Sequence, residues 1–164
     1  MMKISTRTEY GLRCLLVLAK EPIGASLSIS QIAKQEQLPK QYVQQILLRL
    51  SRSGFVRSIR GTQGGFTLAK TAKQISVGAV LRILEGIPFQ NTCNHFNKRS
   101  NCGHLSGCGI RPVWEIISQR LWEALDHIYL DRLIADEKTV GQTLAVELPV
   151  LTSPGMPNQP PSAA

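Results

Sequence analysis

Residues 28–54 read SISQIAKQEQLPKQYVQQILLRLSRSG, and this stretch decides the fold. After the dipeptide Leu38-Pro39, apolar side chains recur at intervals of three and four residues, at Val43, Ile46, Leu47 and Leu50. This spacing predicts a helix over residues 39–53, with Pro39 in its first position and Gly54 ending it.

A shorter helix is predicted just before that turn, over residues 28–37. Ser28 or Ser30 would cap its start, and its apolar side chains would face the core. Two helices joined by a tight turn, the second with a polar outer face, form the helix-turn-helix pattern.

The flanking segments extend this unit on both sides. Helical spacing predicts a helix over residues 6–20, capped by Thr6 or Thr8. The alternating residues 55–60 and the segment 66–68 enclose a glycine-rich turn, which predicts a β-hairpin. Directly after a helix-turn-helix, such a hairpin is a wing. A further helix is predicted from a Ser76 cap to about Glu85.

A long amphipathic segment follows near the C-terminus. Its apolar side chains keep a four-three spacing from Ile110 through Trp114, Ile117, Leu121, Leu125 and Ile128 to Arg132, and Trp122 and Tyr129 widen the stripe. We expect one helix over residues 110–136 that pairs with a second copy of the chain. The alternative is packing against its own winged domain, and both can hold for different faces.

The predicted fold class is therefore mainly α: a winged helix-turn-helix domain with a small β-hairpin wing and a long C-terminal dimerisation helix. The DNA-binding domain would span residues 1–85 and a cysteine-bearing loop residues 86–109. The dimerisation helix would span residues 110–136, and a flexible C-terminal tail residues 137–164.

Charge is distributed unevenly along the chain. Of 19 Lys and Arg residues, 12 lie in residues 1–73 against 3 Asp and Glu, a local balance of +9. Residues 74–164 carry the remaining 7 against 8, a balance of −1. Such a basic half favours a polyanion partner, because binding releases the counterions condensed on DNA. A basic surface that only aids solubility is the alternative.

The candidate DNA contacts lie on the second helix of the motif, at the start of its first helix and on the wing. Glutamine amides match an adenine edge, while lysine and arginine suit phosphates or guanine. Arginine on a wing is suited to the narrow minor groove. A solvated helix face is the alternative for the glutamines. The candidates are Ser30, Lys40, Gln41, Tyr42, Gln44, Gln45, Arg49, Arg57, Arg60, Gly61 and Gly64.

Three cysteines, Cys93, Cys102 and Cys108, crowd the loop before the long helix, spaced Cys-x8-Cys-x5-Cys. Thiolates select zinc, Cu(I) or iron–sulfur iron over harder cations. Structural zinc usually shows paired Cys-x2–4-Cys knuckles, which are absent from this spacing, so an iron–sulfur cluster is preferred. Cys14, among leucines of the first helix, is expected to be a buried hydrophobe.

Several segments, together with the three-cysteine loop, closely resemble the Rrf family of winged-helix regulators, which includes IscR, NsrR and RirA. They are MKIST at 2–6, EYGLR at 9–13, LSISQIA at 27–33, YVQQIL at 42–47, GFVRSIRG at 54–61 and GGF at 64–66. The resemblance covers about residues 2–136. It implies a homodimer that binds palindromic promoter DNA and carries one [2Fe–2S] or [4Fe–4S] cluster per subunit. Iron supply, cluster status, redox or nitric oxide would be the signal.

The chain departs from the family pattern at two points. Members often have five residues between the first two cysteines, where this chain has eight, and IscR-like members have a histidine where Arg111 stands. The resemblance to NsrR-like members implies a carboxylate ligand from the partner subunit's first helix, and Glu9 occupies the matching position. His95, His104, an exogenous ligand or no fourth ligand are the alternatives, and Glu9 can equally be a carboxylate that suits the helix dipole.

Other functions are weighed against this one. A metal-free thiol/disulfide switch formed by two of the three cysteines is the alternative sensor. No general-base motif accompanies the cysteines, so the chain is not expected to be an enzyme. No stretch approaches the roughly 18 apolar residues of a membrane span. Charged residues interrupt any signal-peptide core, and a cytoplasmic protein is expected.

Overall fold

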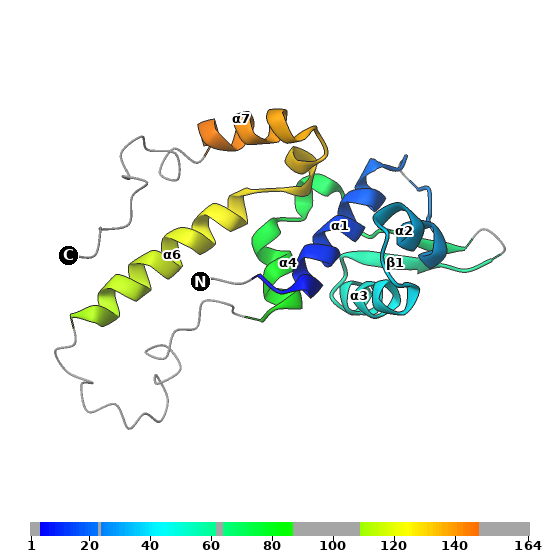
Figure 1. Ribbon diagram of the computed structural model, residues 1–164, viewed down its shortest axis with the longest axis horizontal. Coiled ribbons are helices and arrows are strands. Elements are labelled where there is room, and N and C mark those ends of the chain that lie inside the picture. The colour runs from blue at the N-terminus through cyan, green and yellow to red at the C-terminus, as the bar shows by residue number, and fades with distance from the viewer. Residues whose placement is uncertain (1–3, 23, 62–63, 87–108, 148–164) are drawn as a thin grey trace, which may run out of the picture.

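The computed structural model describes residues 4–22, 24–61, 64–86 and 109–147. Within them the fold is mainly helical with one two-stranded antiparallel sheet, as predicted. Figure 1 shows the helices α1 to α3 and the hairpin gathered at one end of the molecule. The helix α6 points away from that end.

Helix α1 (Thr6–Lys20) has the predicted bounds, but its cap is different. The hydroxyl of Ser5 accepts the amide N–H of Thr8 at 3.4 Å, whereas Thr6 and Thr8 had been expected to cap. Ser5 can cap because its backbone is extended (φ −70°, ψ 150°), which turns its side chain back over the first turn. Thr8 is instead buried inside the helix.

Helices α2 (Ile29–Glu36) and α3 (Lys40–Arg52) form the predicted helix-turn-helix. Ser28 caps α2 in a capping box with Gln31. Gln37 ends α2 in the left-handed conformation (φ 55°), and the Leu38 N–H donates to the Ala33 carbonyl at 2.9 Å. Pro39 keeps an extended ψ of 130° and lies before α3 rather than in its first position.

The hairpin of β1 (Val56–Ile59) and β2 (Gly65–Leu68) is the predicted wing. Its second strand also pairs with the segment before α2: the Phe66 N–H donates to the Leu27 carbonyl at 2.8 Å, and the Leu27 N–H donates back at 3.0 Å. Gly65 permits this approach, because a Cβ there would overlap the Leu27 backbone. The wing is thereby fixed to the helix-turn-helix.

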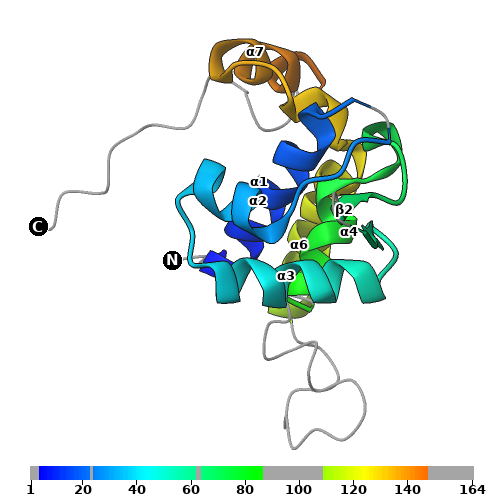
Figure 2. The same ribbon diagram turned by 90° about the vertical axis from the view of Figure 1, so that its right-hand side faces the viewer.

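After the 3₁₀ turn η1 (Ala72–Gln74), helix α4 (Val77–Leu84) begins at the predicted Ser76 cap. It packs against α1 and α3 on one side and against α6 on the other (Figures 1 and 2). The core gathers buried leucine, isoleucine and valine side chains from α1 to α4, from β1 and from the turns between them, including Leu15, Ile32, Ile46, Leu47, Leu50, Val56, Ile75 and Leu84.

The predicted long helix is wrong in its last nine residues, 128–136. Helix α6 spans Ile110–His127, and Ile128 is extended, so the helix does not reach residue 136. The reason is tertiary: the Val77 N–H donates to the Ile128 carbonyl at 2.8 Å, and the Leu130 N–H donates to the Ile75 carbonyl at 3.0 Å. The chain leaves the helix to pair with the start of α4 and to bury Leu130 fully.

The predicted tail is also wrong in its first part. After the 3₁₀ turn η2 (Leu130–Leu133), helix α7 spans Glu137–Glu147. Asp136 begins it, since its carboxylate accepts the Thr139 N–H at 3.0 Å and the Thr139 hydroxyl at 2.7 Å. Residues 148–164 lie outside the described part of the chain. Among the described helices, none is long and apolar enough to cross a membrane.

Gly11 is predicted to be required where α1 meets α4. An added Cβ would overlap the side chain of Leu84, so Gly11→Ala should lower the free energy of unfolding by about 1–3 kcal/mol. Gly141→Ala in α7 is the matched control, because nothing lies within 4 Å of its Cβ position. Urea unfolding of both variants tests this. Equal or greater stability of Gly11→Ala would contradict the packing.

Candidate nucleic-acid interface and sensor loop

Helix α3 presents a polar face opposite its buried one. Val43, Ile46, Leu47 and Leu50 are at most 1% exposed and hold the helix against the core. The predicted contact residues on the other side are exposed: Lys40, Gln41, Gln44, Gln45 and Arg49. With the helix fixed in this way, amide and cationic groups on the side away from the core are exposed to solvent, which suits a major groove.

Two other predicted DNA contacts, Ser30 and Tyr42, differ from each other in exposure. Ser30 is exposed in the first turn of α2. Tyr42 is half-buried, and its ring stands edge-on to that of Tyr10, with centroids 5.8 Å apart. Tyr42 therefore joins α3 to α1 through its ring, and its role as a DNA contact stays a prediction.

Leu48 is a residue that sequence reasoning missed. It is 44% exposed and lies on the outer face of α3 among the polar side chains. The sequence could have indicated that Leu48 is exposed, because it falls outside the three- and four-residue spacing of the buried positions. An exposed leucine on such a face can contact the methyl group of thymine.

The wing places Arg57 and Arg60 in solvent. Across the hairpin, Arg57 pairs with Thr67. The side chain of Thr67 is buried. Gly61 has φ +121°, and the Gly64 N–H donates to its carbonyl at 2.9 Å, which closes the described part of the turn. Residues 62–63 lie outside the described part of the chain.

The predicted cluster ligands Cys93, Cys102 and Cys108 lie outside the described residues, as do His95 and His104. The structure does describe the two ends of that segment, Gly86 after α4 and Gly109 before α6. In the described ranges, no three His, Cys, Asp or Glu side chains come together as a metal site.

Glu85, at the end of α4, contacts the beginning of α1. Its carboxylate accepts the Ser5 N–H, so the end of α4 lies against the beginning of α1. Burial pushes the pKa of Glu85 upward, but hydrogen bonding from Ser5 and the positive charge of Arg7 outweigh it and hold the pKa below its ordinary value. Glu9, exposed in the first turn of α1, lies one turn from this contact.

The first half of α6 has an exposed apolar face. Ile110, Trp114 and Ile117 are 61%, 44% and 51% exposed, and all belong to the predicted stripe. Trp122 does not widen that stripe: the Arg82 guanidinium lies 4.4 Å from the centroid of its ring, so it faces α4. The apolar stripe and the surface that contacts the winged domain are therefore different faces of α6.

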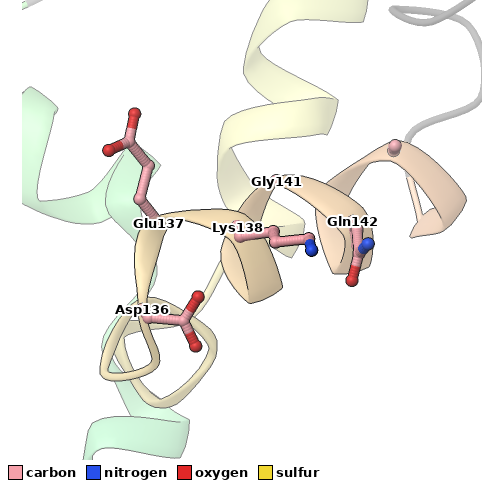
Figure 3. A pocket seen from close by; sticks show the side chains of 6 residues that line it. Asp136, Glu137, Lys138, Gly141 and Gln142 are labelled. Carbon is pink, nitrogen blue, oxygen red and sulfur yellow. The ribbon is translucent and has the colours of Figure 1, made fainter.

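A shallow hollow beside α7 is lined by residues of one segment only, including Asp136, Lys138 and Gln142 (Figure 3). Side chains from distant parts of the chain do not converge there. It has no arrangement that would bind a specific ligand.

The described geometry defines a winged-helix protein of the transcription-regulator class. The profile of the Rrf2 family, described as iron-dependent transcriptional regulators, matches residues 4–136. The chain belongs to this family. It is a DNA-binding transcriptional regulator rather than an enzyme, as the sequence predicts.

Solved structures agree with this assignment. CymR (YrzC), titled the global cysteine regulator of B. subtilis, is 31% identical, with a TM-score of 0.69, over 83% of this chain and 100% of its own. IscR of T. potens is 29% identical, with a TM-score of 0.63, over 79% and 83%. An oxidized form of CymR from Staphylococcus aureus is 29% identical, with a TM-score of 0.65, over 82% and 98%.

Cys14 is predicted to be chemically inert in the folded protein. It is fully buried, and burial raises its pKa to about 12. Because the folded pKa exceeds the ordinary 9.0, the neutral thiol favours folding fully below pH 9, and this contribution is lost as the pH rises toward 12. In a variant with the loop cysteines replaced by serine, iodoacetamide at pH 8 should modify Cys14 only after unfolding. Mass spectrometry measures the modification, and rapid modification of Cys14 in the folded protein would refute this prediction.

The exposed face of α3 is predicted to read bases. Gln44→Ala and Gln45→Ala should each weaken binding to a duplex selected from a random pool by about 1–3 kcal/mol, with little effect on unselected DNA. Gln35→Ala is the matched control, since Gln35 is exposed on α2, away from this face. Fluorescence anisotropy gives the affinities, and equal values for all three variants would contradict the assignment.

The wing is predicted to act mainly through charge. Arg60→Ala should reduce the slope of log affinity against log salt concentration by about one and weaken all duplexes similarly. A salt titration of anisotropy measures this slope. An unchanged slope would remove Arg60 from the interface.

Proposed function

We propose that the protein is a homodimeric transcription regulator that senses iron, redox or nitric oxide status through one iron–sulfur cluster per subunit. The observation that carries this proposal is the position of the three-cysteine segment in the chain. It joins α4, which packs on the DNA-binding helices, to the exposed apolar half of α6. A signal at that segment would therefore act between a DNA-reading unit and a pairing surface.

DNA would be read by α3 in the major groove, with the wing against the flanking backbone or minor groove. Exposure of the amide and cationic side chains of α3 supports this role, as does exposure of Arg57 and Arg60. Leu48 would add an apolar contact to a thymine. Tyr42 would support the recognition helix through Tyr10.

The dimer would form along the exposed stripe of α6. An apolar face of this length is unusual on a protein surface unless a partner covers it. Pairing of two copies by a two-fold axis would present two recognition helices to successive major grooves, which is why palindromic promoter DNA is the proposed target.

The donor set fits an iron–sulfur cluster. Cys93, Cys102 and Cys108 would hold it through three thiolates, which are the ligands that such clusters take. When bound, the cluster supplies an iron centre that responds to oxidants and to nitric oxide. Glu9 of the partner subunit is the proposed fourth ligand; its exposure in the first turn of α1 leaves its carboxylate available. His95 and His104 remain the local alternatives.

A metal-free thiol switch is the second candidate. Its support is the similarity to CymR, one structure of which is an oxidized form. In this alternative two of the loop cysteines would form a disulfide, and Cys14 would take no part because it is buried.

The decisive experiment is anaerobic purification with iron and acid-labile sulfide analysis. We expect visible iron–sulfur absorption and equal iron and sulfide contents, both lost in Cys102→Ala and retained in Cys14→Ala, the matched control. DNA affinity should change at least about fivefold between wild type and Cys102→Ala, as typical coupling between sites requires. Colourless, iron-free protein that loses the mass of two hydrogen atoms when diamide oxidises it would favour the thiol switch.

A further inference from the structure

Helices α4 and α6 are joined by a bidentate ion pair. The two terminal nitrogens of Arg82 donate to the two carboxylate oxygens of Asp126 at 2.6 and 2.7 Å. This hydrogen bonding raises the pKa of Arg82 and holds that of Asp126 below its ordinary value, so both groups stay charged at neutral pH. A two-point contact fixes direction as well as distance, which a single hydrogen bond does not do.

Two further contacts seat this ion pair. The Arg82 guanidinium lies over the ring of Trp122, one turn before Asp126 on α6. On α4, Gly78 lies one turn before Arg82, and a Cβ at Gly78 would overlap the Asp126 carboxylate. We refer to Gly78, Arg82, Trp122 and Asp126 as the α4–α6 joint.

The joint occupies the connection between the two parts of the molecule. Arg82 precedes the cysteine segment by one turn of helix, since α4 ends at Leu84. On the other side, Asp126 lies two residues before Ile128, where backbone pairing holds the chain to the start of α4. The C-terminal end of α6 is thus held to α4 by backbone hydrogen bonds, and the α4–α6 joint fixes the direction of the helix. The first half of α6 is exposed.

The side chains of the pair are 42% and 38% exposed, so solvent screens their attraction and their contribution to stability is small. An interaction that adds little stability but specifies direction suits a joint that must be able to change. It also means that substitutions in the pair should leave the domain folded.

We propose that Arg82 and Asp126 are positioning residues that set the angle of α6 to the winged domain and so transmit the state of the cysteine segment to the recognition helices. This inference rests on the proposed sensor function for its input. The setting of the angle itself does not depend on which chemistry occupies the segment.

The first test measures transmission. In wild-type protein we expect DNA affinity to differ between anaerobically purified and chelator-treated samples within the roughly 5–150-fold range usual for coupled sites. In Asp126→Asn and Arg82→Gln that ratio should fall below about twofold, while iron and sulfide contents stay at the wild-type level. Arg82→Lys, which keeps the charge but loses the two-point contact, should give an intermediate ratio.

The matched control is Arg120→Gln. Arg120 pairs with Glu123 at 3.2 Å within α6, so the variant removes an arginine ion pair without touching α4. It should keep the wild-type ratio. A wild-type ratio in Asp126→Asn would overturn the proposal, as would an equal loss in Arg120→Gln.

The second test measures the angle without any cluster. Nitroxides at Gln35→Cys on α2 and Glu115→Cys on α6, both exposed positions, would be introduced with the loop cysteines replaced by serine. Excess unlabelled chain limits the pulsed-EPR signal to distances within one subunit. We expect one narrow distribution for the parent and for Arg120→Gln, and a broad or shifted one for Asp126→Asn and Arg82→Gln.

The two tests separate the two proposals. Iron-free wild-type protein with no affinity ratio would refute the cluster-based sensor, and the EPR distances would still decide the joint. Narrow, unchanged distances in Asp126→Asn would overturn the joint whatever the cofactor analysis gave.

Discussion

The close approach of α4 to its neighbours on both sides is the constraint on which the arrangement depends. Gly11 of α1 leaves room for Leu84, and Gly78 leaves room for Asp126 of α6. Because neither glycine carries a Cβ, α4 lies close to both helices and connects them mechanically. A protein interior this closely packed moves between discrete arrangements rather than deforming smoothly. Helix α4 therefore contacts both the helices of the winged domain and the helix that is proposed to pair.

Sequence patterns predicted the elements with strong local periodicity. The apolar spacing of α3, the Ser28 and Ser76 caps and the glycine-rich hairpin each follow from interactions within a few residues, and each is present. The same patterns failed where distant contacts decide. The four-three spacing of α6 continues to Arg132, but pairing of Ile128 and Leu130 with the start of α4 ends the helix at His127.

In the candidate site too, features set by local sequence were predicted and features set by distant contacts were not. Exposure of the α3 glutamines and of the wing arginines followed from their places opposite the apolar positions. The role of Trp122 did not, because its spacing also fits the stripe, and only the fold brings Arg82 onto its ring. Tyr42 stays a predicted DNA contact, and its position on α3 did not indicate that its ring also packs on Tyr10, 32 residues earlier in the chain. Side-chain partners that come from another helix carry no signal in a single segment.

The uneven charge of the chain gains a physical meaning from this geometry. The excess of positive charge lies in the half that holds α1 to α3 and the wing, while the half that holds α6 is nearly neutral. Attraction to DNA therefore acts on one end of the molecule, and the apolar stripe of α6 lies beyond it (Figure 1). Since the attraction depends on counterion release, it orients and concentrates the protein on DNA without specifying half-site spacing. In the proposed dimer, the spacing would come from the angle between α6 and the winged domain. A segment that joins α4 to α6 is thus placed where a small change of angle would alter specific binding and leave non-specific attraction intact.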